Sequence, residues 1–199
     1  MNRPDTSLPA ARQADGAIAL REAVMSDAHP IAVVHVRSFQ AIYRRILPNH
    51  VLDCLSVTAR ARIWAQRIAD ADADQRRVVV ADLDGRVAAF LYFGLTPDDD
   101  DSVGRTGHVF SIHTDPNLTG SGIGTTLMEY AASEMADAAF ADATLWVVAE
   151  NDGARRFYDR LGWHTDGARR TELLGLSGEP CAAHDAETIR YRLRLGAES

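Results

Sequence analysis

The sequence predicts a single domain of the α+β class. Its 199 residues, of which 46% are hydrophobic, are enough for one well-buried core and short for two. Short β-rich runs alternate with longer segments whose apolar residues recur at helical spacing, and one adjacent pair of runs has the pattern of a hairpin. Residues 1–16 carry two prolines and scattered charges without periodicity, so we expect a flexible leader there and the domain over residues 17–199.

A strand and three helices are expected in the first part of the chain, over residues 17–23, 28–43, 51–55 and 58–69. Ser26 and Asp27 provide an N-cap signal for the first helix, and Pro48 separates it from the second. Trp64 falls on the apolar side of the third helix, where we expect it in the core.

The second part begins with the clearest hairpin of the chain. Two β-rich runs within residues 76–95 flank Asp84 and Gly85, a pair that tolerates the positive φ of a tight turn. In the last strand, apolar residues alternate with Arg190, Arg192 and Arg194, which predicts a single buried face. The remaining strands are expected at 108–114, 143–149, from 162 onward and at 187–195, and the remaining helices at 123–139 and 151–161.

The charges of the sequence limit the partners that we expect. The formal net charge is -7, which argues against a nucleic-acid surface, and the chain has no lysine, which excludes a Walker A phosphate loop. Four consecutive aspartates at 98–101 predict a solvated loop tip, because like charges repel one another. Attraction of a cationic amine is the alternative role for this loop.

The two cysteines, Cys54 and Cys181, form no C-x-x-C pair and predict reduced thiols rather than a disulfide scaffold or a zinc site. The first twenty residues carry charges where a signal peptide needs an apolar centre, and no apolar run reaches membrane-spanning length. We therefore expect a cytoplasmic protein without a membrane partner or a metal.

Three glycines, Gly120, Gly122 and Gly124, lie between the strand expected at 108–114 and the helix expected at 123–139. A glycine turn that leads from a strand into a helix presents unsatisfied backbone N–H groups and the positive end of the helix dipole, so it predicts a phosphate site. The spacing of these glycines does not fit the dinucleotide fingerprint G-x-G-x-x-G, and only 75 residues follow, so dinucleotide binding is a distant alternative.

The segment HTDPNLTGSGIGTTLMEYA, residues 113–131, resembles the signature of the GNAT superfamily of N-acetyltransferases, in which a Q/R-x-x-G-x-G/A turn binds the pyrophosphate of acetyl-CoA. Thr119 stands where the family has Gln or Arg. The segment VVAENDGARRFYDRLGWHTDG, residues 147–167, is similar to a second family motif, N-x-x-A-x-x-x-Y-x-x-x-G-F/W. A weaker third match covers residues 34–56, and together the resemblance spans almost everything after the leader.

The resemblance implies a mixed, mostly antiparallel central sheet with helices on both faces, in a three-layer arrangement, and two central strands, 108–114 and 144–150, that splay apart. It implies acetyl-CoA as the cosubstrate and a backbone N–H between Ile112 and Thr114, at a family bulge, that polarises the thioester carbonyl. The implied cofactor-binding residues are Ile112, Thr114, Thr119, Gly120, Ser121, Gly122, Ile123, Gly124, Thr125, Asn151, Ala154 and Phe157.

Tyr158 matches the family tyrosine that protonates the leaving thiolate, and we predict this role for it over that of a plain core aromatic. Asn151 matches a residue that contacts the pantetheine arm, and a helix N-cap is its alternative or additional role. His113 and Glu150 lie at the ends of the two splayed strands, but a structural role is favoured for both, and neither is assigned to catalysis. Tyr43 is expected near the acceptor, whereas Phe39 is expected in the core.

These features predict an N-acetyltransferase that moves the acetyl group from acetyl-CoA to a primary amine, by direct attack in a ternary complex. The acceptor is expected to be a small molecule or a peptide N-terminus, and the resemblance implies a homodimer as the usual assembly. A sensor or interaction module that binds acetyl-CoA without catalysis is the alternative.

Overall fold

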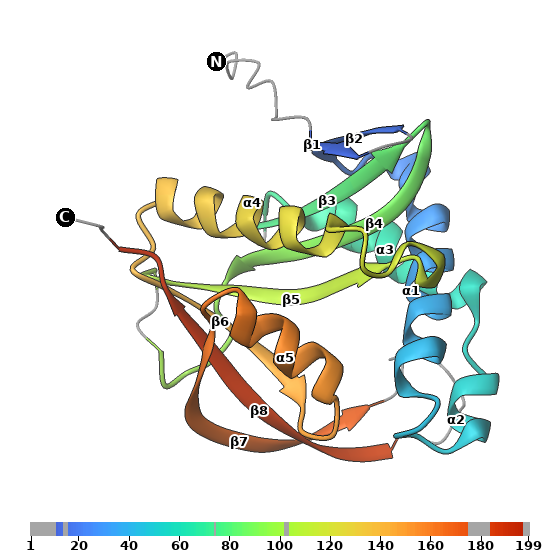
Figure 1. Cartoon of the computed structure of the whole chain (residues 1–199). Coiled ribbons are helices and arrows are strands. Elements are labelled where there is room, and N and C mark those ends of the chain that lie inside the picture. Colours follow the sequence, from blue (N-terminus) through green and yellow to red (C-terminus); the bar gives the residue numbers. More distant parts are fainter. Residues whose placement is uncertain (1–10, 14–15, 74, 102–103, 175–183, 197–199) are drawn as a thin grey trace.

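A computed structural model of the chain describes residues 11–13, 16–73, 75–101, 104–174 and 184–196. Its centre is an eight-stranded sheet in the order β1-β2-β3-β4-β5-β6-β8-β7 (Figure 1). Neighbouring strands are antiparallel except for β5 and β6, which are parallel. The mixed, mostly antiparallel sheet predicted from the sequence is therefore confirmed.

The elements follow the predicted order closely. The strands are β1 (Ala11–Gln13), β2 (Gly16–Glu22), β3 (Arg76–Leu83), β4 (Arg86–Leu95), β5 (Thr106–Thr114), β6 (Asp142–Val148), β7 (His164–Leu174) and β8 (His184–Arg194). The helices are α1 (Ala28–Tyr43), α2 (Asn49–Asp53), α3 (Val57–Asp70), α4 (Ile123–Asp137) and α5 (Asp152–Arg160), with short 3-10 turns η1 (Met25–Asp27) and η2 (Pro116–Leu118). Within the described part of the chain, no helix is long and apolar enough to cross a membrane.

One strand falls inside the segment predicted as a leader. β1 pairs with β2 across a tight connection in which Gln13 lies opposite Gly16. The sequence of this strand lacks the apolar periodicity from which strands were predicted, so the sequence carried no signal for it. Residues 1–10, 14 and 15 of the predicted leader lie outside the described residues.

The two local sequence signals, at the hairpin and at the start of α1, have different outcomes. The hairpin at Asp84 and Gly85 is confirmed, and both residues have positive φ, 52° and 79°. Asp27 precedes α1 as predicted but does not cap it; its carboxylate accepts from the backbone N–H of Val24 at 2.8 Å and from Arg21 at 2.6 Å.

Helices cover both faces of the sheet around β4. Leu91 and Phe93 pack in the core cluster beneath α4, while Phe90 and Tyr92, which alternate with them, pack with Trp64 of α3 on the opposite side. In Figure 1, α4 and α5 lie in front of the sheet, whereas α1 and α3 lie on its other side. The three-layer arrangement expected from the sequence is confirmed.

The parallel pair β5 and β6 is incomplete. Its register runs only from Thr106 opposite Asp142 to Val109 opposite Leu145, after which the two strands separate. The separation coincides with a β-bulge in β5. Tyr92 of β4 pairs with Ser111, but the next residue of β4, Phe93, pairs with Val109, so one residue of β5 has no partner on β4. The extra residue is Phe110, so the bulge lies before the segment Ile112–Thr114 where the sequence placed it.

Cys54 differs from its sequence prediction. It was expected as a reduced thiol, but it is disulfide-bonded. Cys181, the other cysteine of the chain, lies outside the described residues. Sequence spacing gave no signal for this bond, since distant cysteines are brought together only by the fold.

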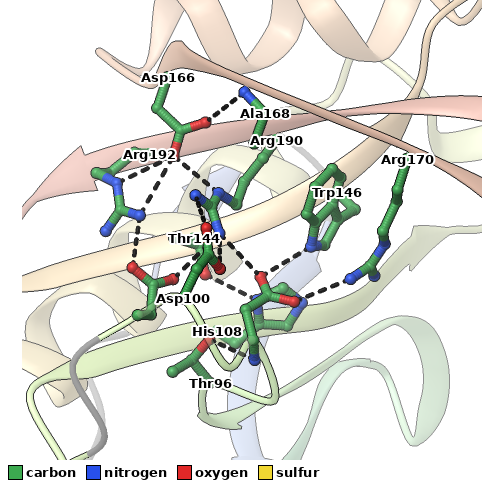
Figure 2. Close-up of polar contacts among 12 residues, drawn as sticks. Thr96, Asp100, His108, Thr144, Trp146, Asp166, Ala168, Arg170, Arg190 and Arg192 are labelled. Atoms are coloured by element: carbon green, nitrogen blue, oxygen red, sulfur yellow. Dashed lines mark hydrogen bonds and ion pairs between the residues drawn. The ribbon is translucent and has the colours of Figure 1, made fainter.

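The aspartates at 98–101 were predicted to form a solvated tip, and this prediction is wrong for Asp98 and Asp101. Their side chains are only 4% and 6% exposed, because the loop folds over the face of β6 and β8 that carries no helix. Asp98 accepts from the indole N–H of Trp146 at 2.9 Å and from Arg170 at 2.9 Å. Both donors are labelled in Figure 2. The repulsion among the aspartates is offset by arginines from β7 and β8.

Arg190 is the centre of this ion-pair cluster and is itself buried, so the expected single buried face of β8 is also corrected. Its guanidinium binds Asp100 at 2.7 Å and Asp166 at 2.8 Å (Figure 2). Arg192 binds Asp101 at 2.6 Å. Trp146 packs against two guanidinium groups, with Arg170 at 4.0 Å and Arg190 at 5.5 Å from the ring centroid.

We predict that Arg190→Met lowers the free energy of unfolding by about 3 kcal/mol, since it leaves buried carboxylates without their central counter-charge. The control is Arg194→Met on the same strand, whose side chain is exposed and should change stability by less than about 0.5 kcal/mol. Urea unfolding measures both. Equal effects of the two substitutions would contradict a structural role for the cluster.

Candidate functional site

A cavity of about 950 Å³ opens where β5 and β6 separate. Its walls come from three places that are distant in sequence: the glycine turn with the start of α4, the beginning of α5, and the C-terminal half of α1. The separated strands form its floor, so the same irregularity that breaks the sheet creates the site.

The glycine turn forms the first wall, through Thr119, Gly120, Gly122, Ile123, Gly124 and Thr125. Gly120 and Gly122 have φ of 85° and 88°, which residues with a Cβ rarely adopt. Gly124 has no positive φ, and a Cβ there would lie 3.4 Å from the ring of Phe157 on α5, which is an ordinary van der Waals contact. The turn therefore combines a left-handed backbone with a close approach of two helices.

The start of α4 has the features of an anion site. The first backbone N–H of α4 with a helical hydrogen bond is that of Thr126, which donates to the carbonyl of Gly122 at 3.1 Å. The preceding N–H groups of the first turn have no acceptor within the helix and line the cavity. The helix dipole adds positive character at the same place.

β5 supplies two further donors. The N–H of Asp115 bonds to Ala88 of β4 at 2.8 Å, and successive N–H groups of a strand alternate in direction. The N–H groups of Ile112 and Thr114 therefore point away from β4, into the gap that β6 leaves open. Both residues line the cavity, as the sequence predicted.

The third set of predicted residues lies on α5 and just before it. Asn151, Ala154, Phe157 and Tyr158 all line the cavity. The Asn151 side chain also accepts from the N–H of Ala154 at 3.1 Å, so its alternative role as N-cap of α5 is real.

Tyr158 packs against core aromatics and reaches the cavity at the same time. Its ring centroid is 6.0 Å from that of Tyr191 and 6.4 Å from that of Trp163. Burial, with the neighbouring Tyr43 in second place, raises the pKa of Tyr158 well above the usual range of a phenol. The hydroxyl therefore stays protonated at neutral pH.

Ser121 is the one predicted cofactor-binding residue that does not line the cavity. Its hydroxyl is buried and is without a hydrogen-bond partner among the described residues. An orphaned hydroxyl inside an anion-binding turn fits a turn built to approach an oxygen-rich group.

Sequence reasoning placed the helical segment of Phe39 and Tyr43 near the acceptor, but it missed the residues of α1 and of the turn after it that line the cavity. Ser38, Ala41, Ile42, Arg45 and Ile46 line the cavity there. Their spacing of three and four residues indicates one face of a helix, but no pattern in the sequence shows that this face borders a cavity rather than the core. Phe39 is buried as predicted, and Tyr43 lies behind the wall, where a hydrogen bond joins it to Asn151.

His113 and Glu150, which the sequence analysis left unassigned, both line the cavity, as does Arg160. Burial lowers the pKa of His113 to about 4, with a smaller contribution from the charge of Arg60, so the imidazole is neutral at pH 7. Glu150 is exposed at the end of β6.

The site suits coenzyme A on physical grounds. A diphosphate matches the N–H donors of the glycine turn, and a pantetheine arm needs the extended row of donors that β5 exposes where β6 has separated. Residues 38–163 match the family model described as Acetyltransferase (GNAT) family.

The chain belongs to the GNAT family of acetyltransferases. The match covers well over half of the sequence and contains all three walls of the cavity. The resemblance proposed from the glycine turn and the Asn151–Trp163 segment is thus confirmed, and with it an acetyl-CoA-dependent acyltransferase.

Two curated relatives support this family. An uncharacterised N-acetyltransferase of Bacillus subtilis, YuaI, is 28% identical over 135 residues, or 67% of this chain and 73% of the relative. An uncharacterised N-acetyltransferase of Mycobacterium tuberculosis is 27% identical over 150 residues, or 75% of this chain and 90% of the relative.

Solved structures share the fold at low sequence identity. The PaiA N-acetyltransferase of Thermoplasma acidophilum, in complex with coenzyme A, has a TM-score of 0.66 at 14% identity and covers 89% of this chain and 98% of its own. YncA of Salmonella typhimurium, a putative acetyltransferase with its cofactor acetyl-CoA, has a TM-score of 0.64 at 16% identity and covers 92% of this chain and 96% of its own.

We predict that Gly120→Ala weakens acetyl-CoA binding at least tenfold by calorimetry, because the turn must keep φ near 85° to direct its N–H groups. Gly85→Ala is the matched control, since it has φ of 79°, and an added Cβ at either glycine meets nothing within 4 Å. Both variants should lose about 1–2 kcal/mol of stability from left-handed strain. Unchanged affinity in Gly120→Ala would exclude this turn as the phosphate site.

Proposed function

We propose that this GNAT acetyltransferase moves the acetyl group directly from acetyl-CoA to a primary amine, in a ternary complex and without an acyl-enzyme. The observation that carries the proposal is the continuity of the cavity through the gap between β5 and β6. The phosphate-binding turn and α5 lie on one side of the sheet, and the α1 wall lies on the other. Two substrates that approach from opposite sides meet at this gap.

In this proposal, residues of the cavity hold acetyl-CoA, polarise its carbonyl and protonate the leaving group. Acetyl-CoA supplies a thioester, and the N–H groups of the α4 turn hold its phosphates. The N–H groups of Ile112 and Thr114 are directed at the gap, where they orient the arm and polarise the carbonyl oxygen. The protonated hydroxyl of Tyr158 donates its proton to the departing thiolate.

The acceptor class is a small amine or a peptide N-terminus. The cavity carries both charge signs, with Glu150 and Asp152 near Arg45 and Arg160, so charge alone does not select between the two. Structures with the same fold include a putative phosphinothricin N-acetyltransferase and a ribosomal-protein-alanine N-acetyltransferase from Brucella melitensis, one from each class.

A thiol-release assay with acetyl-CoA and a panel of small amines and peptides tests this function. Micromolar acetyl-CoA binding with turnover of at least one amine supports the proposal. Tight binding without turnover on any amine would instead favour a non-catalytic sensor, and the absence of binding would refute both.

We predict that Tyr158→Phe lowers kcat about a hundredfold while the Kd for acetyl-CoA changes less than twofold, because only the proton donor is lost. Tyr191→Phe is the control, since Tyr191 is a buried tyrosine beside Tyr158 that does not line the cavity. The same loss of kcat in both variants would point to packing rather than to proton donation.

A further inference from the structure

His113 occupies the acceptor side of the gap between β5 and β6. Its neighbours on β5, Ile112 and Thr114, face α4, so the alternation of the strand turns the His113 ring toward α1. The Nδ1 atom lies 3.0 Å from the hydroxyl of Ser38 on α1, and both residues line the cavity. An imidazole and a hydroxyl thus stand where the second substrate enters.

The ring of His113 is held in place by other rings. It stacks on Phe90 of β4, with centroids 5.4 Å apart, and lies 4.5 Å from the ring of His35 on α1. His35 is fixed in turn, since the buried indole N–H of Trp64 donates to its Nδ1 at 3.1 Å. This preorganisation is typical of a group whose position matters for chemistry.

We propose that His113 accepts the proton of the attacking amine through its Nε2 atom, and that Ser38 is a positioning residue that fixes the ring and its tautomer. The inference rests on the proposed function and assigns the proton acceptor that this function requires. For Nε2 to accept, Nδ1 must carry the ring proton and donate it to the Ser38 hydroxyl.

The surroundings of His113 keep its ring neutral, with one nitrogen free of a proton. His35 faces it from α1 and Arg60 contributes positive charge from α3, while Phe90 of β4 is apolar. Burial lowers the pKa of both histidines, so His113 is neutral at pH 7 and passes an accepted proton onward rather than storing it.

The step balances in atoms and charge. The N–C bond to the acetyl group forms as the C–S bond breaks, the amine proton passes to Nε2 of His113, and the proton of Tyr158 passes to sulfur. Exchange with water then returns both residues to their starting states. An acceptor that arrives as an ammonium ion releases one proton to solvent per turnover.

The kinetic test compares His113→Gln with the wild-type enzyme on the best amine of the panel. We expect kcat/KM to fall at least a hundredfold at pH 7 while the Kd for acetyl-CoA stays within twofold. The deficit should persist when the pH reaches the pKa of the free amine, because a neutral amine still loses a proton to Nε2 as the N–C bond forms. In His113→Ala, added imidazole should restore part of the rate.

The control is His108→Gln, which removes another buried histidine of the same strand. His108 bonds to Thr144 at 2.8 Å and does not line the cavity, so its loss should leave the pH profile unchanged. A His113→Gln enzyme with a wild-type rate at every pH would overturn the inference and leave the proposed function standing. A wild-type enzyme without turnover on any amine would overturn both.

A second measurement does not depend on turnover. ¹⁵N NMR of the histidine side chains, with the His113 signals assigned through His113→Gln, reports which ring nitrogen carries the proton. In the wild-type protein we expect the Nδ1–H tautomer at pH 7. In Ser38→Ala we expect this tautomer to be less strongly favoured, because the hydroxyl that accepts from Nδ1–H is gone. A proton on Nε2 would leave no acceptor toward the amine and would overturn the inference.

Discussion

The site depends on the point at which β5 and β6 stop pairing. Up to Val109 and Leu145 the two strands form an ordinary parallel ladder, and beyond it the bulge at Phe110 turns β5 away. Unpaired strands inside a sheet leave backbone donors without partners, an arrangement that is costly unless a ligand satisfies them. An extended chain with its own acceptors, such as a pantetheine arm, can bind to these unpaired backbone donors.

A broken sheet needs support elsewhere, and the two faces receive it differently. On the α4 side, β5, β6 and β8 share one apolar core with Tyr158. On the other side, α1 and α3 cover the first half of the sheet, but over Trp146 and Arg190 the covering layer is the aspartate loop and its ion pairs. Such buried ion pairs add little net stability when they form, but the loss of one partner destabilises the protein strongly. The cluster thus fixes the second half of the sheet while α5 packs on its opposite face.

Much of this was accessible from the sequence because it depends on local chemistry. Gly120 and Gly122 are required by positive φ, Asn151 caps a helix, and Asp84 with Gly85 closes a hairpin, so each leaves a signal within a few residues. The burial of Arg190 could not be predicted, since alternation shows that a strand has two faces but not what covers each. Ser38 became visible as a site residue only when the fold brought it beside His113 from 75 positions away.

The central claim is that the N–H groups exposed by the separated strand receive the arm of coenzyme A. Amide hydrogen exchange, followed residue by residue by NMR with and without coenzyme A, tests it most directly. The account predicts slowed exchange at Ile112 and Thr114 and in the first turn of α4, with little change at Asp98 and Asp101. Unchanged exchange at Ile112 and Thr114 in the saturated complex would contradict it.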